Sequence, residues 1–143
     1  METIIVDFYD GAYGPTIRLE TSRVELLETF KSLFLSLSAK RVLSARLRDL
    51  AFVTMSPNVA DIELFVCTAV GEPYKTLRLL SSKLGPPSFK WSRSVEGWLE
   101  CAELLDGLVE TRRPGHQYLN LPREGVDDAL VEVSYAEPRV RAG

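Results

Sequence analysis

The sequence contains one segment whose apolar residues follow a helical period with almost no interruption, residues 91–110, which read WSRSVEGWLECAELLDGLVE. Ser94 is suited to cap a helix beginning at Val95, because a serine side chain accepts a hydrogen bond from the first helical turn. The apolar residues then recur at steps of three and four. They are Val95, Trp98, Cys101, Ala102, Leu105, Leu108 and Val109. We therefore expect a helix here that packs its apolar face into a core.

The opposite face of this expected helix carries only negative charge. Its acidic residues are Glu96, Glu100, Glu103, Asp106 and Glu110, and the segment contains no lysine or arginine from residue 95 to residue 110. Four neighbouring pairs of like charge each destabilise the helix by about 0.2–0.5 kcal/mol. One interpretation is a solvated face neutralised by cations of the same chain, namely Lys40, Arg41, Arg46 and Arg48. The other is a docking surface for a basic protein partner, since complementary charge raises association rates.

The segments before this helix predict a hairpin and a second helix. Residues 3–9 and 16–20 alternate apolar and polar side chains, so we expect two paired strands joined by a longer loop containing glycine and proline. Ser22 and Glu25 fit a capping box, which predicts a helix over residues 22–38. Its apolar stripe comprises Leu26, Leu27, Phe30, Leu33, Phe34 and Leu37.

The remaining periodic segments are short and extended. Residues 40–48 favour a strand, although their composition also suits a helix. Segments 51–55 and 61–70 read as strands that pair as a hairpin, and residues 75–80 fit either a strand or one helical turn. Further extended segments are expected at residues 88–91, 117–119 and 129–135.

Length and composition favour one domain. A chain of 143 residues that is 45% apolar can bury a single core. We expect a single α+β domain over residues 1–137, with two amphipathic helices packed on one face of a mainly antiparallel sheet. Residues 138–143 are expected to form a loose tail.

Charge and hydropathy narrow the choice of partners. The formal net charge of -3 is mild, and the basic residues at 40–48 lack interleaved aromatic residues, which argues against nucleic-acid binding. No apolar run reaches 18 residues, and the first residues do not read as a secretion signal. These patterns favour a cytoplasmic protein without a membrane segment.

His116 is the single histidine and the main candidate for a catalytic group. No serine or cysteine stands near it in a nucleophile motif, and one histidine with the distant Cys67 and Cys101 does not supply a tetrahedral zinc set. We therefore predict no metal, no cofactor and no catalytic residue. The alternative is an enzyme or small-ligand domain with a pocket around His116, Tyr118 and Asp128.

The C-terminal third resembles a group of small uncharacterised bacterial proteins. The resemblance rests on patches at residues 89–91, 96–98, 104–105, 115–119 and 127–135, spread over a stretch of about 45 residues. Some proteins of that kind are similar to predicted immunity proteins of polymorphic-toxin systems. The resemblance implies a cytoplasmic α+β protein that neutralises a toxin domain by binding it. We accordingly expect a non-catalytic protein-binding module with a basic toxin domain as its partner; a homodimeric structural protein is the remaining alternative.

Overall fold

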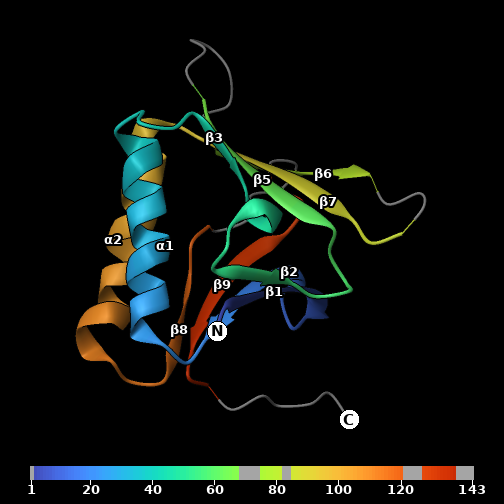
Figure 1. Cartoon of the computed structure of the whole chain (residues 1–143). Helices are drawn as coiled ribbons and strands as arrows, with labels where there is room; N and C mark the ends of the chain where they lie inside the picture. The colour runs from blue at the N-terminus through green and yellow to red at the C-terminus, as the bar shows by residue number, and fades with distance from the viewer. Residues whose placement is uncertain (1, 68–74, 82–84, 121–126, 138–143) are drawn as a thin grey trace.

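The computed structural model describes residues 2–67, 75–81, 85–120 and 127–137. The described residues form two helices, nine strands and one short 3-10 helix (Figure 1). In chain order they are β1 (Ile4–Gly11), β2 (Gly14–Thr21), α1 (Val24–Ser38), β3 (Ser44–Arg46), η1 (Leu47–Asp49), β4 (Val53–Met55), β5 (Asp61–Val66), β6 (Lys75–Ser81), β7 (Ser88–Arg93), α2 (Val95–Thr111), β8 (Gly115–Tyr118) and β9 (Leu130–Tyr135). The predicted α+β class is confirmed, whereas the expected tail at 138–143 lies outside the described residues.

The strands form two mixed sheets. Sheet A has the order β4-β1-β2-β9-β8, and sheet B has the order β3-β5-β7-β6. Antiparallel pairing joins β1 to β2, β3 to β5, β6 to β7 and β8 to β9, whereas β1 with β4, β2 with β9 and β5 with β7 are parallel. Antiparallel pairs therefore predominate among the described strands.

The predicted hairpin between residues 51–55 and 61–70 is wrong. β4 pairs with β1 in sheet A, whereas β5 lies between β3 and β7 in sheet B. The connection crosses from one sheet to the other because each of its ends bonds a different sheet: Ser56 N–H donates to Val6 O, and Ala60 N–H donates to Pro87 O. Residues 68–70 of the predicted second strand lie outside the described residues.

The hairpin of β1 and β2 is confirmed, with a shorter connection than expected. Strand pairing continues to Gly11 and Gly14, so only residues 12 and 13 connect the strands. Gly14 has φ +106°, a conformation that side-chain-bearing residues rarely adopt. This glycine allows the tight turn.

Helix α1 is confirmed, but its predicted capping box is wrong. The helix begins at Val24, its N-cap is Arg23, and no side chain caps it. The Arg23 N–H instead donates to Oγ1 of Thr21, which ends β2. Four members of the predicted stripe are buried, namely Leu27, Phe30, Phe34 and Leu37.

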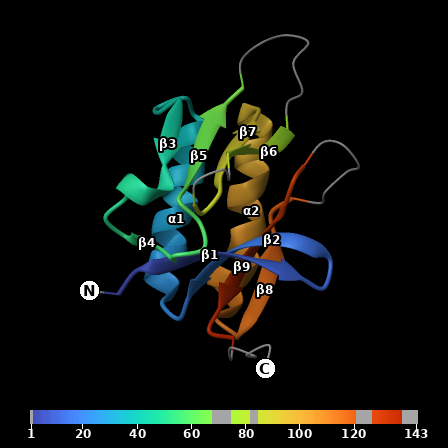
Figure 2. The same cartoon turned by 90° about the vertical axis from the view of Figure 1, so that its right-hand side faces the viewer.

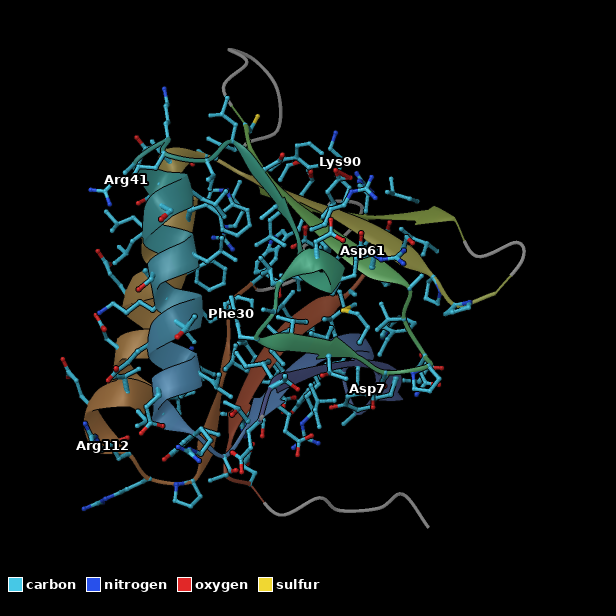
Figure 3. All side chains as sticks on the ribbon, in the orientation of Figure 1. Asp7, Phe30, Arg41, Asp61, Lys90 and Arg112 are labelled. Atoms are coloured by element: carbon cyan, nitrogen blue, oxygen red, sulfur yellow. The ribbon has the colours of Figure 1, made fainter. Side chains whose placement is uncertain are left out.

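The two helices form one layer beside the sheets and run in opposite directions (Figure 1). Figure 2 shows both sheets in front of that helical layer. One buried core joins all of them, and Phe30 points from α1 toward the strands (Figure 3). Neither helix has the length and apolar character needed to cross a membrane.

Aromatic contacts connect the layers of the core. Phe34 of α1 stacks on Trp98 of α2 with ring centroids 5.6 Å apart, and Trp98 meets Trp91 of β7 edge to face at 4.9 Å. Phe8 of β1 contacts Phe89 of β7 at 5.1 Å, which links the two sheets. Both tryptophans are thus core residues.

The two short segments whose sequences fit either a strand or a helix contain strands in the structure. Residues 44–46 form β3 and continue into η1, so the expected strand over residues 40–48 is confirmed only in part. Residues 75–81 form β6.

Candidate functional site

Helix α2 begins at Val95, as its sequence predicts. The Ser94 Oγ accepts a hydrogen bond from the Gly97 N–H at 3.1 Å, which satisfies one of the unpaired donors of the first turn. The helix ends at Arg112, whose φ of 53° is left-handed and whose N–H donates to Leu108 O. Arg41 and Arg112 lie at opposite ends of the helical layer (Figure 3).

The acidic residues of α2 divide into two groups. Glu96, Glu103 and Glu110 are exposed, and none of them makes an ion pair with any described residue. Asp106 instead lies on the side that meets α1, where it forms an ion pair with Lys31. Asp106 is therefore not part of the exposed acidic row that the sequence predicts, whereas the other acids of the row are exposed.

Glu100 balances a buried cation. The Arg93 side chain ends β7 and is only 3% exposed, and it donates to Glu100 Oε1 at 3.1 Å and to Leu119 O at 2.8 Å. Its Nε has no hydrogen-bond partner among the described residues. Glu100 itself is half-exposed, so it serves the fold and also contributes charge to the outer surface.

The expected neutralisation of α2 by the basic residues at 40–48 is not observed. Arg46 pairs with Glu63 at 3.6 Å and with Asp61 at 4.0 Å, both in sheet B. Within the described ranges, Lys40, Arg41 and Arg48 form no ion pair with an acid of α2. The charge on the outer side of α2 is thus not offset from this segment.

Two exposed leucines of the helical layer are not predicted from the sequence. Leu99 is 42% exposed between Glu96 and Glu103 on α2, and Leu35 is 39% exposed on α1. Leu99 could have been noticed, because it falls outside the apolar stripe of its helix. We define the acidic helix face as Glu96, Leu99, Glu100, Glu103 and Glu110.

The second predicted site is assembled only in part. His116 and Tyr118 lie on the same face of β8, with ring centroids 5.5 Å apart. Asp128 is not beside them: it accepts from the Leu79 N–H at 2.8 Å and lies 3.7 Å from Arg78, at the edge of sheet B. The predicted pocket of His116, Tyr118 and Asp128 therefore does not form as a unit.

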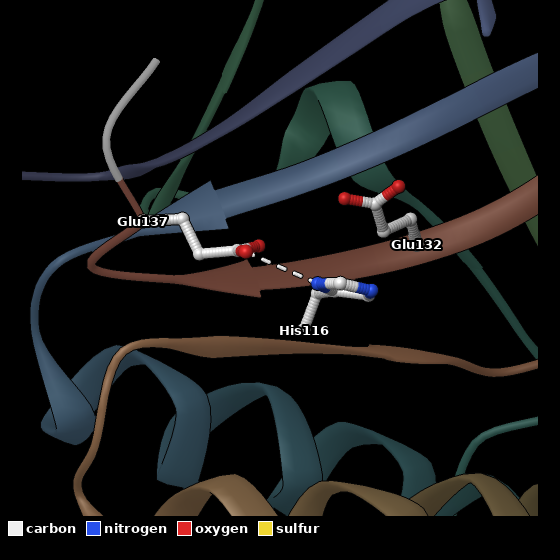
Figure 4. Close-up of side chains that lie close together, drawn as sticks. All are labelled: His116, Glu132 and Glu137. Atoms are coloured by element: carbon white, nitrogen blue, oxygen red, sulfur yellow. Dashed lines mark hydrogen bonds and ion pairs between the residues drawn. The ribbon is translucent and has the colours of Figure 1, made fainter. Parts of the chain in front are cut away.

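His116 has a different acidic neighbour, Glu137. The His116 Nδ1 lies 3.1 Å from Glu137 Oε2 (Figure 4). The Ser134 Oγ donates to Glu137 Oε1 at 2.8 Å. Burial by itself raises the pKa of Glu137, but the hydrogen bonds from His116 and Ser134 outweigh it and lower the pKa below the usual value. Ser134 thus bonds the carboxylate and not the imidazole, so this group is not arranged as a nucleophile with its base.

Glu132 completes the polar face around the histidine. It lies opposite Tyr118 in the β8–β9 pairing and 3.9 Å from the Arg18 Nε. Burial and the nearby Glu132 carboxylate raise the pKa of Tyr9 and of Tyr118. The sequence indicated neither Glu132 nor Glu137, since their approach to His116 depends on strand pairing and on the turn after β9.

Comparison with protein families, curated proteins and solved structures finds no match to this chain. The function is therefore inferred from the residues and their geometry.

Proposed function

We propose that this protein is a non-catalytic protein-binding module and that the acidic helix face is its contact surface. The observation that carries the proposal is the set of three exposed carboxylates on α2, Glu96, Glu103 and Glu110, which form no ion pair within the described chain. Leu99 is exposed among them and offers apolar contact area. A surface of this kind suits a partner with a complementary basic patch around an apolar centre.

The energetics of α2 support this proposal. Like charges spaced three or four residues apart destabilise a helix, and Glu110 lies at the negative end of the helix dipole, which adds about 0.3–1 kcal/mol of unfavourable interaction. Glu96, at the other end, is favoured by the dipole. A basic partner would remove this repulsion on binding. It would also be attracted at long range, which raises the association rate at low salt.

The partner that we propose is a toxin domain with a basic surface, so the protein would act as an immunity protein. This choice follows from the resemblance of the C-terminal third to proteins of that kind, together with the charge of the helix face. Basic surfaces are common on domains that bind nucleic acid, because such domains must contact phosphates. A nuclease toxin is the class of partner that fits best.

The experiment compares two triple variants that change the net charge equally. The first carries Glu96→Gln, Glu103→Gln and Glu110→Gln. The control carries Glu2→Gln, Asp10→Asn and Asp49→Asn, three exposed acids outside α1 and α2. The probe is a purified toxin domain with a basic surface, sought among the products of the neighbouring genes, and its affinity is measured by calorimetry at low and at high salt.

We expect the first variant to lose at least about tenfold in affinity at low salt and to show a flatter salt dependence, because its attraction to a basic patch is removed. The control variant should bind as the native protein does. Equal effects of the two triples would contradict a specific role for the acidic helix face. A particle mass of twice 16.0 kDa in the absence of the probe would favour a homodimer instead.

A further inference from the structure

Strand pairing brings metal-ligating side chains together on the outer face of sheet A. His116 of β8 lies opposite Ser134 of β9, and Tyr118 lies opposite Glu132. Residues that are directly opposite point to the same side of a sheet, so His116 and Glu132 share one face. The chain then turns at Ala136, whose φ is 53°, and Glu137 reaches back to the histidine.

The three side chains lie at distances suited to one ion. One ligand atom each from His116, Glu132 and Glu137 can be chosen so that all three lie within 4.8 Å of one another. Zinc binds nitrogen and oxygen ligands at about 2.0–2.2 Å, which places neighbouring ligands of a tetrahedral site about 3.3–3.6 Å apart. The His116 Nδ1 and Glu137 Oε2 are 3.1 Å apart, and the two glutamates lie on either side of the imidazole (Figure 4). Small rotations of these side chains would therefore enclose an ion.

Neighbouring side chains hold the carboxylates in place. Arg18 donates to the Ser134 Oγ at 3.0 Å, and Ser134 donates in turn to Glu137. Arg18 also lies 3.9 Å from Glu132. Hydrogen bonds of this kind orient metal ligands, and their loss usually costs metal affinity.

The charge balance also favours a cation. Two carboxylates and one guanidinium leave a formal net charge of about -1, so a divalent ion is attracted even though Arg18 opposes it. The Ser134 hydroxyl is fully buried, whereas His116 is exposed and accessible from solvent. An ion can thus enter from the side of the histidine.

We propose that His116, Glu132 and Glu137 bind a divalent transition metal ion such as Zn²⁺, with further positions open to water. Imidazole favours zinc, copper, iron and nickel over calcium and magnesium, which prefer sites made only of oxygen. Three protein ligands with an open position are typical of zinc sites that hold water. The proposal is independent of the acidic helix face, which lies on a different element.

The test uses tag-free protein, because a histidine tag would bind the same ions. After dialysis against a chelator, Zn²⁺ is titrated by calorimetry, and Co²⁺ is titrated while its visible absorption is recorded. His116 is the single histidine, so its imidazole resonances in NMR spectra report binding without ambiguity. The variants are His116→Ala and Glu137→Gln. The controls are Asp49→Asn, which removes an exposed acid elsewhere, and Cys67→Ser, which removes a half-buried thiol.

We expect one equivalent of Zn²⁺ to bind and the His116 resonances to shift with it. His116→Ala and Glu137→Gln should each weaken binding by more than about tenfold, since even outer residues of metal sites contribute 10–100-fold. Both controls should bind as the native protein does. Binding that survives His116→Ala, binding that is lost in Cys67→Ser, or the absence of saturable binding would overturn the proposal.

Discussion

Individual residues of α2 that look equivalent in the sequence have different roles in the fold. Asp106 pairs with Lys31 of α1, and Glu100 pairs with the buried Arg93. Glu103 stands between them on the helix surface without an ion pair among the described residues. The same carboxylate chemistry therefore stabilises the helix pair at one position and adds repulsion at the next.

Neutralising these two acids should change stability in opposite directions. Asp106→Asn removes an interhelical ion pair and should lower the free energy of unfolding by up to about 1 kcal/mol. Glu103→Gln relieves repulsion from Glu100 and Asp106 and should raise it by about 0.2–0.5 kcal/mol. Urea denaturation at low salt measures both changes, and high salt should reduce them. A stabilising Asp106→Asn variant would show that the ion pair contributes nothing.

Glu137 makes the stability of the protein depend on pH. Its pKa in the folded protein lies below the ordinary value of 4.5, because hydrogen bonds from His116 and Ser134 outweigh the effect of burial. A group of this kind stabilises the fold fully above pH 4.5, and its contribution is lost as pH falls through the lower folded pKa. Glu137→Gln should therefore be less stable than the native protein at pH 7 and equal to it in strong acid. Thermal unfolding of both proteins, measured from strong acid to pH 7, checks the prediction. A difference in stability that stays constant with pH would contradict it.

At the scale of the element, α2 is specified by local signals at both ends and along one face. Ser94 caps its first turn, and its apolar stripe is buried. Arg112, in the left-handed conformation, is its C-cap. Two glycines interrupt this helix, and their surroundings differ. A Cβ added at Gly97 would lie 2.9 Å from the Arg93 Nε and 3.0 Å from the Arg93 Cβ, whereas a Cβ added at Gly107 meets nothing within 4 Å.

The same substitution at the two glycines should thus have opposite effects. Gly107→Ala should stabilise the protein by up to about 1 kcal/mol, because alanine loses less backbone entropy in a helix. Gly97→Ala gains the same propensity but must displace the buried Arg93, so we expect a net loss of about 1–2 kcal/mol. Chemical denaturation of both variants measures the difference. Equal stabilisation by both would mean that the packing of Arg93 against α2 is not tight.

At the scale of the whole molecule, two sheets share one core with a single helical layer. Phe8 and Phe89 connect the sheets directly, and Phe34 contacts tryptophans from both α2 and β7. Sheet A and sheet B therefore depend on the same buried side chains. Neither sheet buries its inner face without the other layers.

This arrangement predicts that the two sheets unfold together. In hydrogen exchange, the slowest amides of β2 and β9 in sheet A and of β5 and β7 in sheet B should report free energies within about 1 kcal/mol of one another. The reason is that opening either sheet exposes the shared aromatic core. Mass spectrometry or NMR of exchanging amides provides the measurement. If the slowest amides of one sheet report a free energy of opening several kcal/mol below that of the other sheet, the two sheets do not share one cooperative core.

The elements with local signals can be predicted from the amino-acid sequence alone. The helix over residues 95–111, its serine cap and the alternating strands follow from neighbouring side chains, because helical and extended periods repeat within a few residues. The capping box at Ser22 was wrong even though its pattern is local: the helix begins later, with Arg23 as its N-cap, and the Arg23 N–H donates to Thr21 Oγ1.

Contacts between residues that are far apart in the sequence depend on how the whole chain packs. Lys31 and Asp106 are separated by 75 positions and His116 and Glu137 by 21, and no local period encodes such pairs. The separation of β4 and β5 into different sheets likewise depended on hydrogen bonds to β1 and to Pro87. Distant partners are selected by the packing of the shared core, and that packing brings His116 and the two glutamates together on sheet A.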